Sequence, residues 1–307
     1  MVCRFWLVYL ALHHFWFKLA DLMNLRIFRH IADLRAELDA LRAQGKRIAC
    51  VPTMGNLHEG HLQLIHLARK NADIVVATIF VNRLQFGLNE DWDQYPRTFD
   101  SDCQKLDAAR CDYLFFPDET EMYPNGMEGQ TRVLAPTMTD ILCGASRPGH
   151  FEGVTTVVTK LFHIVEPDVA IFGLKDYQQL AIVKRMATDL CMGVEIIGAP
   201  IARDKDGLAL SSRNAYITED ERPKANQLHQ SLSNAKQKIE QGERDFRAIE
   251  ESAKAEIEAA GFRLDYFSVC NAETLDPAVD DDKELAILGA LFTSAARLID
   301  NLTLNLK

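Results

Sequence analysis

The amino-acid sequence predicts an α/β protein: a doubly wound parallel sheet followed by a smaller α+β domain. Three observations support this prediction. Helical patterns alternate with short apolar runs from residue 31 to residue 200, as they do in βαβ units. The apolar runs are rich in β-branched residues, which is typical of parallel strands that are buried on both faces. With 307 residues, 48% of them hydrophobic, the chain is long enough to bury one large core or two moderate ones.

The first 22 residues stand apart from this pattern. Residues 5–20 are mostly apolar and follow Arg4, but His13, His14 and Lys18 interrupt the run. The run is also shorter than the roughly 20 apolar residues that span a bilayer. We therefore expect no membrane anchor. Because Met23 is a plausible natural start, we expect residues 1–22 to be an upstream extension that contributes nothing to the fold.

Residues 31–200 divide into alternating elements. Ile31, Leu34, Leu38 and Leu41 recur at intervals of three and four, which predicts a helix over residues 31–44. The same reasoning predicts further helices over residues 62–68, 99–109, 154–165 and 177–190, and strands over residues 48–51, 73–81, 113–116, 169–172 and 194–197. We assign residues 23–201 to one domain, in which ligands bind at the carboxyl ends of the strands.

The pattern changes after residue 200. Thr218 and Glu221 have the spacing of a capping box, which predicts that a long polar helix begins at residue 218. Helices followed by strands indicate a small α+β domain, which we assign to residues 202–307. Its other predicted elements are a helix over residues 246–260 and strands over residues 264–269 and 285–292.

A turn with two histidines follows the strand predicted at residues 48–51. Backbone N–H groups at the start of a helix favour anionic ligands, and glycines such as Gly55 and Gly60 let a ligand approach the backbone. His58 and His61 are three residues apart, so on a helical turn they share a face and both can point at one triphosphate. The turn therefore indicates a phosphate site.

Two other interpretations of the histidine pair stay open at this point. A zinc pair in a metalloprotease helix has the pattern His-Glu-x-x-His, whereas this turn has a shorter spacing and a helix-weakening glycine inside it. The two side chains can also be ordinary surface or core histidines. A His-x-Gly-His turn after the first strand nevertheless resembles the signature of the nucleotidyltransferase superfamily, whose members attack ATP at its α-phosphate.

Polar side chains follow three other predicted elements. Gln85 comes after the strand over residues 73–81 and can offer a donor and an acceptor to a hydroxy acid. Lys175 follows the strand over residues 169–172 and can reach phosphates, and Gln179 lies one helical turn later. Just past the domain boundary, two hydroxyls and a guanidinium can clamp a phosphate: Ser211, Ser212 and Arg213. Taken singly, each of these residues can equally be an ordinary loop residue.

Charge and cysteine content narrow the range of partners. A formal net charge of −10 gives no basic field for a polyanion, which argues against nucleic acid, although a local positive pocket can still hold ATP. The seven cysteines include no Cys-x-x-Cys pair, and their number is odd. This pattern fits free thiols in a reducing compartment, so we expect a cytoplasmic protein.

Seven motifs together resemble the pantothenate synthetase family in order and spacing, from about Met23 to the end of the chain. They are Pro52-Thr53-Met54-Gly55, residues 58–61, Phe80-Val81-Asn82 with Gln85, Tyr95-Pro96-Arg97-Thr98, Arg147-Pro148-Gly149-His150-Phe151, residues 175–179 and residues 211–214. The resemblance implies a Rossmann-like fold of the nucleotidyltransferase type with a C-terminal lid domain. It also implies a pantoate–β-alanine ligase of pantothenate and coenzyme A biosynthesis, which forms pantoyl adenylate from ATP and releases AMP and diphosphate.

The resemblance assigns roles to individual residues. His61 is the residue usually given as proton donor, and His58, Lys175, Ser211, Ser212 and Arg213 neutralise charge beside it. Gln85 and Gln179 hold pantoate and β-alanine, and Asp102 matches an acidic position near the Mg²⁺ that accompanies ATP. The implied assembly is a homodimer. The implied ATP site comprises Met54, Gly55, Asn56, Leu57, His58, Glu59, Gly60, His61, Gly173, Leu174, Lys175, Asp176, Ala202, Leu210, Ser211, Ser212 and Arg213.

Three residues depart from the family pattern. Arg83 stands where proline is usual, Leu174 where an acidic or amide residue is common, and Leu210 where methionine is usual. None of them removes a charged group from the reaction path.

Two other functions stay open from sequence alone. A different nucleotidyltransferase, which transfers AMP to a phosphorylated acceptor, would share the histidine turn but would want further basic residues in place of Gln85 and Gln179. A non-catalytic nucleotide-binding or membrane-associated protein, suggested only by residues 5–20, would have no need of Lys175 together with the Ser-Ser-Arg loop.

Overall fold

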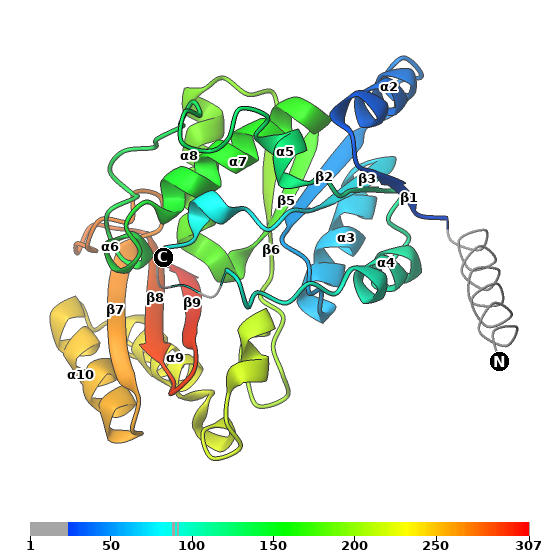
Figure 1. The fold of residues 1–307 in the computed structure, drawn as a ribbon. Coiled ribbons are helices and arrows are strands. Elements are labelled where there is room, and N and C mark those ends of the chain that lie inside the picture. The colour runs from blue at the N-terminus through cyan, green and yellow to red at the C-terminus, as the bar shows by residue number, and fades with distance from the viewer. Residues whose placement is uncertain (1–23, 88–89, 91, 307) are drawn as a thin grey trace, which may run out of the picture.

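The computed structural model describes residues 24–306 apart from residues 88, 89 and 91. Within this part of the chain, six parallel strands form one sheet in the order β1-β4-β3-β2-β5-β6 (Figure 1). After β2 the chain adds β3 and β4 on one side of that strand and then β5 and β6 on its other side, which is the doubly wound arrangement. The strands are β1 (Arg26–Phe28), β2 (Ile48–Thr53), β3 (Ile74–Ile79), β4 (Tyr113–Phe115), β5 (Val169–Gly173) and β6 (Glu195–Ala199).

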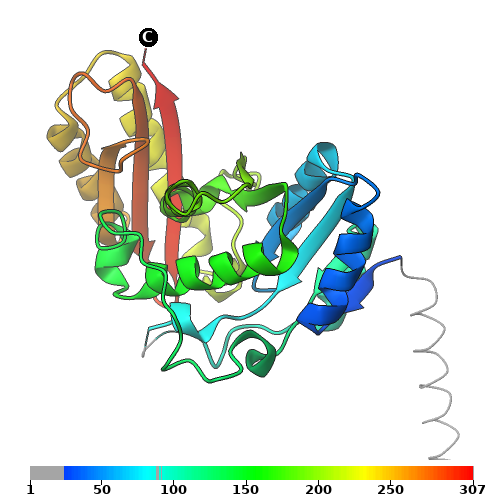
Figure 2. The ribbon, with the colours of Figure 1, turned by 90° about the horizontal axis from the view of Figure 1, so that it is seen from above.

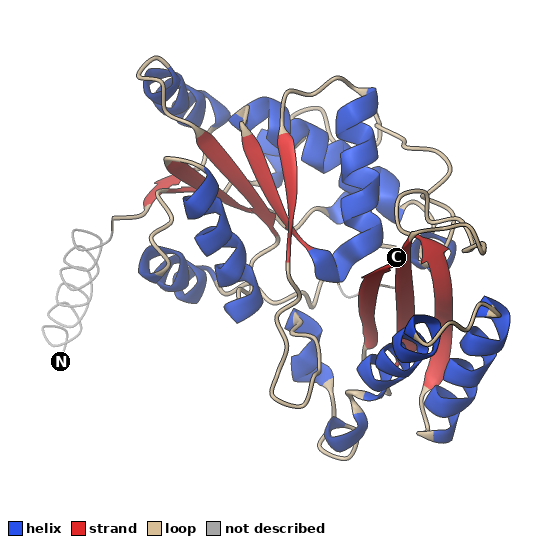
Figure 3. Cartoon of the chain, turned by 180° about the vertical axis from the view of Figure 1, so that it is seen from behind, coloured by secondary structure: helices blue, strands red, loops and turns tan. Residues whose placement is uncertain are grey.

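Helices cover both faces of this sheet, as Figure 3 shows from behind. On β2, Ile48 and Cys50 join the core under α2, α7 and α8, whereas Ala49 and Val51 join the core under α3 and α4. This alternation is why the strands read as continuous apolar runs. The longer helices of this region are α2 (Ile31–Arg42), α3 (Glu59–Asn71), α4 (Phe99–Ala108), α7 (His150–Val165) and α8 (Tyr177–Asp189); α5 (Glu119–Met122) and α6 (Cys143–Ser146) are short.

Three antiparallel strands form a second sheet in the order β7-β8-β9, with bounds β7 (Arg263–Asn271), β8 (Glu284–Phe292) and β9 (Arg297–Asn305). On β8, Leu285 and Ile287 pack under α9 (Gln227–Glu240) and α10 (Phe246–Ala259), whereas Ala286 and Leu288 join the core of the first sheet. Figure 2 shows the green helices of the middle of the chain between the two sheets. The fold class predicted from the sequence is therefore confirmed.

The order of the strands identifies where a ligand binds. Neighbouring strands β3 and β5 lie on opposite sides of β2, so the direction of winding changes there and a crevice opens outside the carboxyl ends. Segments that follow these ends carry the predicted polar residues. They include the 3-10 turns η1 (Arg83–Gln85) after β3, η2 (Leu174–Asp176) after β5 and η3 (Ser212–Tyr216) after β6.

Several sequence predictions need correction. No long helix begins at Thr218: a 3-10 turn, η4 (Arg222–Lys224), comes first and α9 begins at Gln227. Thr218 Oγ1 does donate to a Glu221 carboxylate oxygen (3.0 Å), but that carboxylate also accepts from Ser294 N (2.7 Å). The capping-box pair therefore fastens a loop instead of starting a helix. The helix expected over residues 154–165 begins at residue 150, and strands β1 and β9 were not predicted.

The extension expected at residues 1–22 lies outside the described residues. Among the residues that the structure describes, no helix combines the length and the apolar character needed to cross a bilayer.

Candidate active site

The turn after β2 combines a tight backbone with hydrogen bonds from the strand end. Thr53 Oγ1 donates to Thr78 O on β3 (2.7 Å) and accepts from Gly55 N (3.2 Å). Gly55 and Asn56 have positive φ angles, 82° and 50°. Glycine adopts such angles without strain, whereas a side chain at the second position needs support from its surroundings. The turn delivers His58 to the N-terminus of α3.

The two histidines cap α3 reciprocally. His58 Nδ1 accepts from Gly60 N (3.2 Å), and His61 Nδ1 accepts from His58 N (3.2 Å). Because a backbone N–H can only donate, each neutral ring carries its proton on Nε2. The ring centroids lie 4.1 Å apart. A β-carbon at Gly60 would lie 3.0 Å from the His58 ring, which explains the glycine inside the pair.

Both histidines are neutral at pH 7 in this structure. Burial lowers the pKa of His61 to about 3, helped by His58, Lys175 and Lys105. Burial also lowers the pKa of His58 to about 4, again helped by the two lysines. Each ring therefore brings an Nε2–H donor to the site. An anionic ligand would raise both pKa values, because opposite charge favours the protonated form.

The turn after β3 fixes the predicted Gln85 amide. Gln85 Oε1 accepts from Asn82 Nδ2 (3.1 Å), and Gln85 Nε2 lies 3.2 Å from Met54 Sδ, a weak acceptor. Asn82 Nδ2 also donates to Gly153 O on α7 (3.0 Å). A β-carbon at Gly153 would lie 2.4 Å from Leu84 O, so only glycine lets α7 approach this turn. The donor end of Gln85 consequently faces the histidine turn.

A charged network behind Gln85 was not assigned a role from the sequence. Arg147 donates to both Glu90 carboxylate oxygens (2.6 Å each) and to His150 Nε2 (2.9 Å). Because the guanidinium only donates, His150 carries its proton on Nδ1, which donates to Gln85 O (2.7 Å). Burial and the nearby Arg147 lower the pKa of His150 to about 4. The sequence feature that could have indicated this network is the Arg-Pro-Gly-His-Phe motif, which contains both Arg147 and His150.

The turn after β5 carries Lys175. Asn301 Nδ2, on β9, donates to Leu174 O (2.8 Å) and to Lys175 O (2.9 Å), so the second sheet fixes the backbone of this turn. Lys175 forms no ion pair with any described residue, and Gln179 has no hydrogen-bond partner among them. Both side chains line the cleft described below and are available to a ligand.

The segment after β6 folds back to form the opposite wall. Leu210 N donates to Ala202 O (2.8 Å). Ser211 Oγ accepts from Arg213 N (3.2 Å) and so caps η3. Ser212 Oγ lies 3.4 Å from Asn56 O, which connects this wall to the histidine turn.

These segments enclose one cleft at the carboxyl ends of the strands. It holds about 1270 Å³ of space that no atom occupies, open solvent included. Apolar side chains of α7, including Val154, Val157 and Leu161, form one side of it. The sequence-predicted residues that line the cleft are Met54, His58, Gly60, His61, Gln85, Gly173, Lys175, Asp176, Gln179, Ala202, Leu210, Ser211, Ser212 and Arg213.

The other residues assigned to the ATP site lie off the cleft wall. Gly55, Asn56 and Leu57 form the turn behind it, and Glu59 is exposed. The Leu174 side chain packs beside Gly198, where an added β-carbon would lie 3.0 Å from Leu174 Cδ2. Leu174 therefore acts through its backbone carbonyl, and the side chain that departs from the family pattern does not reach the site.

Asp102 does not fit the role of a Mg²⁺ ligand. Its side chain belongs to a residue that is only 1% exposed, and its oxygens accept hydrogen bonds from Asn56 N (2.9 Å), Leu57 N (2.8 Å) and Thr98 Oγ1 (3.0 Å). Mg²⁺ dehydrates reluctantly and keeps several waters, whereas these oxygens lie in a buried turn and bind its N–H groups. Among the described residues, no group of three or more His, Cys, Asp or Glu side chains is arranged to hold a metal.

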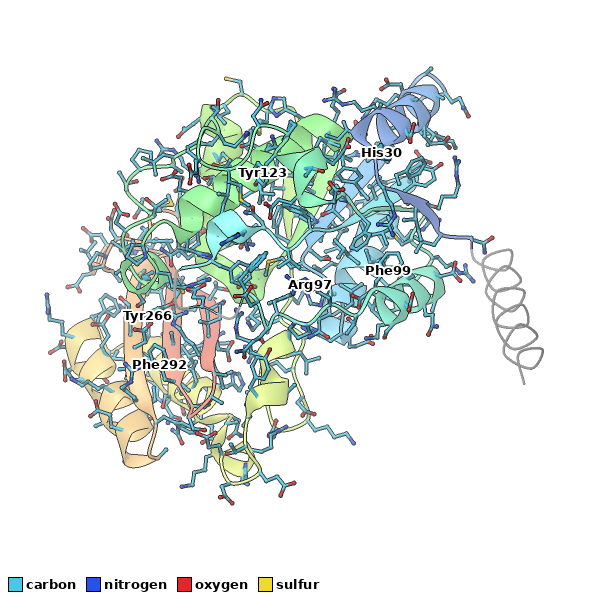
Figure 4. All side chains as sticks on the ribbon, in the orientation of Figure 1. His30, Arg97, Phe99, Tyr123, Tyr266 and Phe292 are labelled. Atoms are coloured by element: carbon cyan, nitrogen blue, oxygen red, sulfur yellow. The ribbon has the colours of Figure 1, made fainter. Side chains whose placement is uncertain are left out.

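Arg83, which stands where the family usually has proline, packs on an aromatic ring. Its guanidinium carbon lies 4.9 Å from the centroid of the Trp92 ring, and Arg97, labelled in Figure 4, lies 5.3 Å from the same ring. Arg83 is exposed and stacks on the aromatic face, an arrangement worth about 0.5–1 kcal/mol at such sites. It fastens the loop after η1 and adds no charge to the cleft wall.

Comparison with known proteins identifies this arrangement. The family model described as pantoate-beta-alanine ligase matches residues 26–303. The chain is 61% identical to a pantothenate synthetase of Cellvibrio japonicus over 279 residues, which cover 91% of this chain and 99% of the relative. It is 60% identical to a pantothenate synthetase of Saccharophagus degradans, with 92% and 99% of the two chains covered.

Solved structures agree with the sequence relatives. The pantothenate synthetase of Thermus thermophilus superposes with a TM-score of 0.84 at 43% identity, covering 90% of this chain and 98% of that one. A pantoate-beta-alanine ligase from Francisella tularensis, described as complexed with beta-gamma ATP and beta-alanine, gives a TM-score of 0.76 at 33% identity, covering 91% and 97%.

Proposed function

The chain belongs to the pantoate–β-alanine ligase family, and from this premise we propose how its residues carry the reaction. The enzyme condenses pantoate with β-alanine in an ATP-dependent ligation. A carboxylate is a poor acyl donor, so the reaction proceeds in two steps. A pantoate carboxylate oxygen bonds to the α-phosphorus as the bond to diphosphate breaks. The β-alanine amine, after losing a proton, then bonds to the pantoyl carbonyl carbon, and AMP leaves.

The phosphates of ATP bind at the histidine turn. The observation that carries this assignment is the pair of Nε2–H donors of His58 and His61, fixed at the N-terminus of α3. Lys175 and Arg213 add positive charge from two other segments of the same cleft. Catalysis of adenylation then consists of positioning and charge neutralisation, because the first step transfers no proton. Ser211 and Ser212 add hydroxyl donors on the facing wall.

Pantoate and then β-alanine bind beside Gln85 and Gln179. Pantoate combines two hydroxyls with two methyl groups, and this part of the cleft combines two amides with the apolar side chains of α7.

Met54 and the adjoining strand ends complete the nucleotide pocket. Its remaining members are Gly173, Asp176, Ala202 and Leu210. Gly55, Asn56, Leu57, Glu59 and Leu174 contribute through the backbone or from behind the wall.

We also propose the metal, the assembly and the compartment. When bound with ATP, Mg²⁺ would neutralise charge on the phosphates, whose hard oxygens would hold it. We also propose a homodimer in the cytoplasm; the described cysteines are free thiols, which suits a reducing compartment. Light scattering of the purified chain tests the dimer.

The division into two domains near residue 201 is likewise proposed. Residues 24–201 contain the parallel sheet, and residues 202–306 contain the antiparallel sheet with its own core under α9 and α10. The packing of Ala286 and Leu288 into the first core supports a C-terminal domain held closely over the cleft.

Substitution of His61 tests the site. Pantoate, ATP and Mg²⁺ without β-alanine should exchange labelled diphosphate into ATP, and His61→Ala should lower kcat for this exchange on the order of 10²- to 10³-fold, as loss of one charge-stabilising donor does. His61→Gln is a second variant, because glutamine at this position of a capping box still accepts from His58 N.

Thermal unfolding and His66→Ala complete the test. His66 is exposed on the same helix, so its removal should leave kcat unchanged. If His61→Ala folds normally and exchanges diphosphate at the wild-type rate, His61 has no part in the reaction, and Lys175 and Arg213 become the charges to examine. Absence of exchange by a wild-type protein that forms pantothenate would refute the free adenylate.

A further inference from the structure

Helix α4 holds the backbone of the histidine turn from both sides. Asp102 Oδ2 accepts from Asn56 N (2.9 Å), and Asp102 Oδ1 accepts from Leu57 N (2.8 Å). Three residues later on the same helix, Lys105 Nζ donates to Leu57 O (2.6 Å). The amide and the carbonyl of Leu57 are thus bound by two charged side chains that share one face of α4.

The turn needs such support because its conformation is unfavourable. Asn56 has a φ of 50°, a left-handed angle that asparagine adopts more readily than most residues with a side chain but less readily than glycine. Leu57 is 2% exposed, so water does not reach its backbone groups easily. Charge-assisted hydrogen bonds to buried amides are stronger than neutral ones. Asp102 and Lys105 therefore supply what the turn's own sequence lacks.

The position of the turn determines where the histidines point. Leu57 directly precedes His58, the N-cap of α3, and His61 is bonded to His58 N. A shift of Leu57 therefore moves both Nε2–H donors together. Misplacement by about 1 Å is enough to cost on the order of 10²-fold in rate.

We propose that Asp102 and Lys105 are positioning residues for adenylation, which act through the backbone of Asn56 and Leu57 on His58 and His61. This inference rests on the role proposed above for the two histidines in binding ATP. Asp102 has no part in holding Mg²⁺, because its oxygens are already used by the turn and by Thr98.

Asp102→Asn is the test, because an asparagine must place an N–H₂ against one of the two backbone N–H groups. We expect kcat/KM for ATP in diphosphate exchange to fall on the order of 10²-fold, with KM for β-alanine unchanged in the full reaction. The Mg²⁺ concentration for half-maximal exchange should stay at the wild-type value. Lys105→Met keeps the side-chain stem, loses the hydrogen bond and should weaken ATP use in the same pattern.

Asp107→Asn is a matched control on the same helix. Asp107 Oδ1 also accepts from two consecutive amides, Asn24 N (2.8 Å) and Leu25 N (3.1 Å), but these lie at the entry to β1. Because both bonds go to Oδ1, an oxygen that asparagine keeps, this variant loses the charge without a forced N–H₂ contact and should keep both its stability and its kcat/KM for ATP. If Asp102→Asn fails to fold, Lys105→Met carries the test.

Three results would overturn the proposal. One is a raised Mg²⁺ requirement in Asp102→Asn, which would make Asp102 a metal ligand. Another is an equal loss of activity in the Asp102 and Asp107 variants, which would make both merely structural. The third is unchanged ATP kinetics in folded Asp102→Asn or Lys105→Met. Inactivity of the wild-type protein in diphosphate exchange would instead count against the proposed function, so the two failures are distinguishable.

Discussion

Substitution of Asn301 offers a direct test of how the second sheet shapes the active site. Asn301 is 3% exposed on β9, and its Nδ2 atom donates to the carbonyls of Leu174 and Lys175 at 2.8 and 2.9 Å. Asn301→Leu keeps a side chain of similar size and removes both donors. The two carbonyls of the Lys175 turn then lose their partner in a partly buried place.

The magnitude follows from these two hydrogen bonds. Each neutral hydrogen bond contributes about 0.5–1.5 kcal/mol net, so the free energy of unfolding should fall by about 1–3 kcal/mol. The lost bonds hold the backbone that carries Lys175, so ATP binding should weaken as well. A loss of about 1.4 kcal/mol in the binding of ATP corresponds to a tenfold rise in its dissociation constant.

Denaturant unfolding and calorimetric titration with a non-hydrolysable ATP analogue measure the two effects. Asn305→Leu is the control, since Asn305 is exposed at the end of the same strand and should change neither quantity. Normal stability together with normal analogue affinity in Asn301→Leu would show that β9 does not hold the Lys175 turn.

Two further perturbations test the geometry of the site. In the folded chain, the pKa values of His58, His61 and His150 are lowered to about 4, 3 and 4. Below about pH 6.5 these histidines therefore bind protons in the unfolded chain but not in the folded chain. The free energy of unfolding should therefore fall as the pH drops from about 6.5 towards 4, measured as denaturation midpoints, and a flat profile would contradict the neutral assignment. Gly153→Ala would place a β-carbon 2.4 Å from Leu84 O, so it should cost about 1–3 kcal/mol of stability and raise KM for pantoate. Gly193→Ala, which meets nothing within 4 Å, is its control, and equal effects of the two substitutions would refute the steric argument.

The main elements of the fold could be predicted because their signals are local. Strands β2 and β3 are apolar on both faces, and α2 shows apolar residues at helical spacing. Strand β9 escaped prediction because Asp300 and Asn301 interrupt its apolar pattern, although both are buried. Asp300 accepts two hydrogen bonds from Arg203 (2.6 and 2.9 Å), and Asn301 binds the Lys175 turn. These polar residues are buried for reasons that lie elsewhere in the chain, which no local pattern records.

The same distinction applies to the site. Gln85, Lys175 and the histidine turn could be predicted because carboxyl ends of parallel strands meet at one edge of a sheet. The contacts that fix these residues could not: 126 residues separate Asn301 from Lys175, and 45 separate Asp102 from Leu57. Asp102 shows the consequence. The family resemblance suggested a carboxylate near Mg²⁺, and only its hydrogen-bond partners reveal a backbone support.

The spacing of the two histidines decides between the phosphate and the zinc interpretations of the turn. Because the two histidines are three positions apart, His58 occupies the N-cap and His61 the third helical position, so each Nδ1 accepts a backbone N–H. A spacing of four would leave the second ring without that bond. A histidine binds zinc through an unprotonated nitrogen, but here Nδ1 is occupied and Nε2 carries the proton. If Nε2 bound zinc, the ring proton would move to Nδ1. Nδ1 could then no longer accept its hydrogen bond from the backbone N–H. This geometry supports the proposal that the pair donates to an anion, in which case capping and phosphate recognition are one property of this turn.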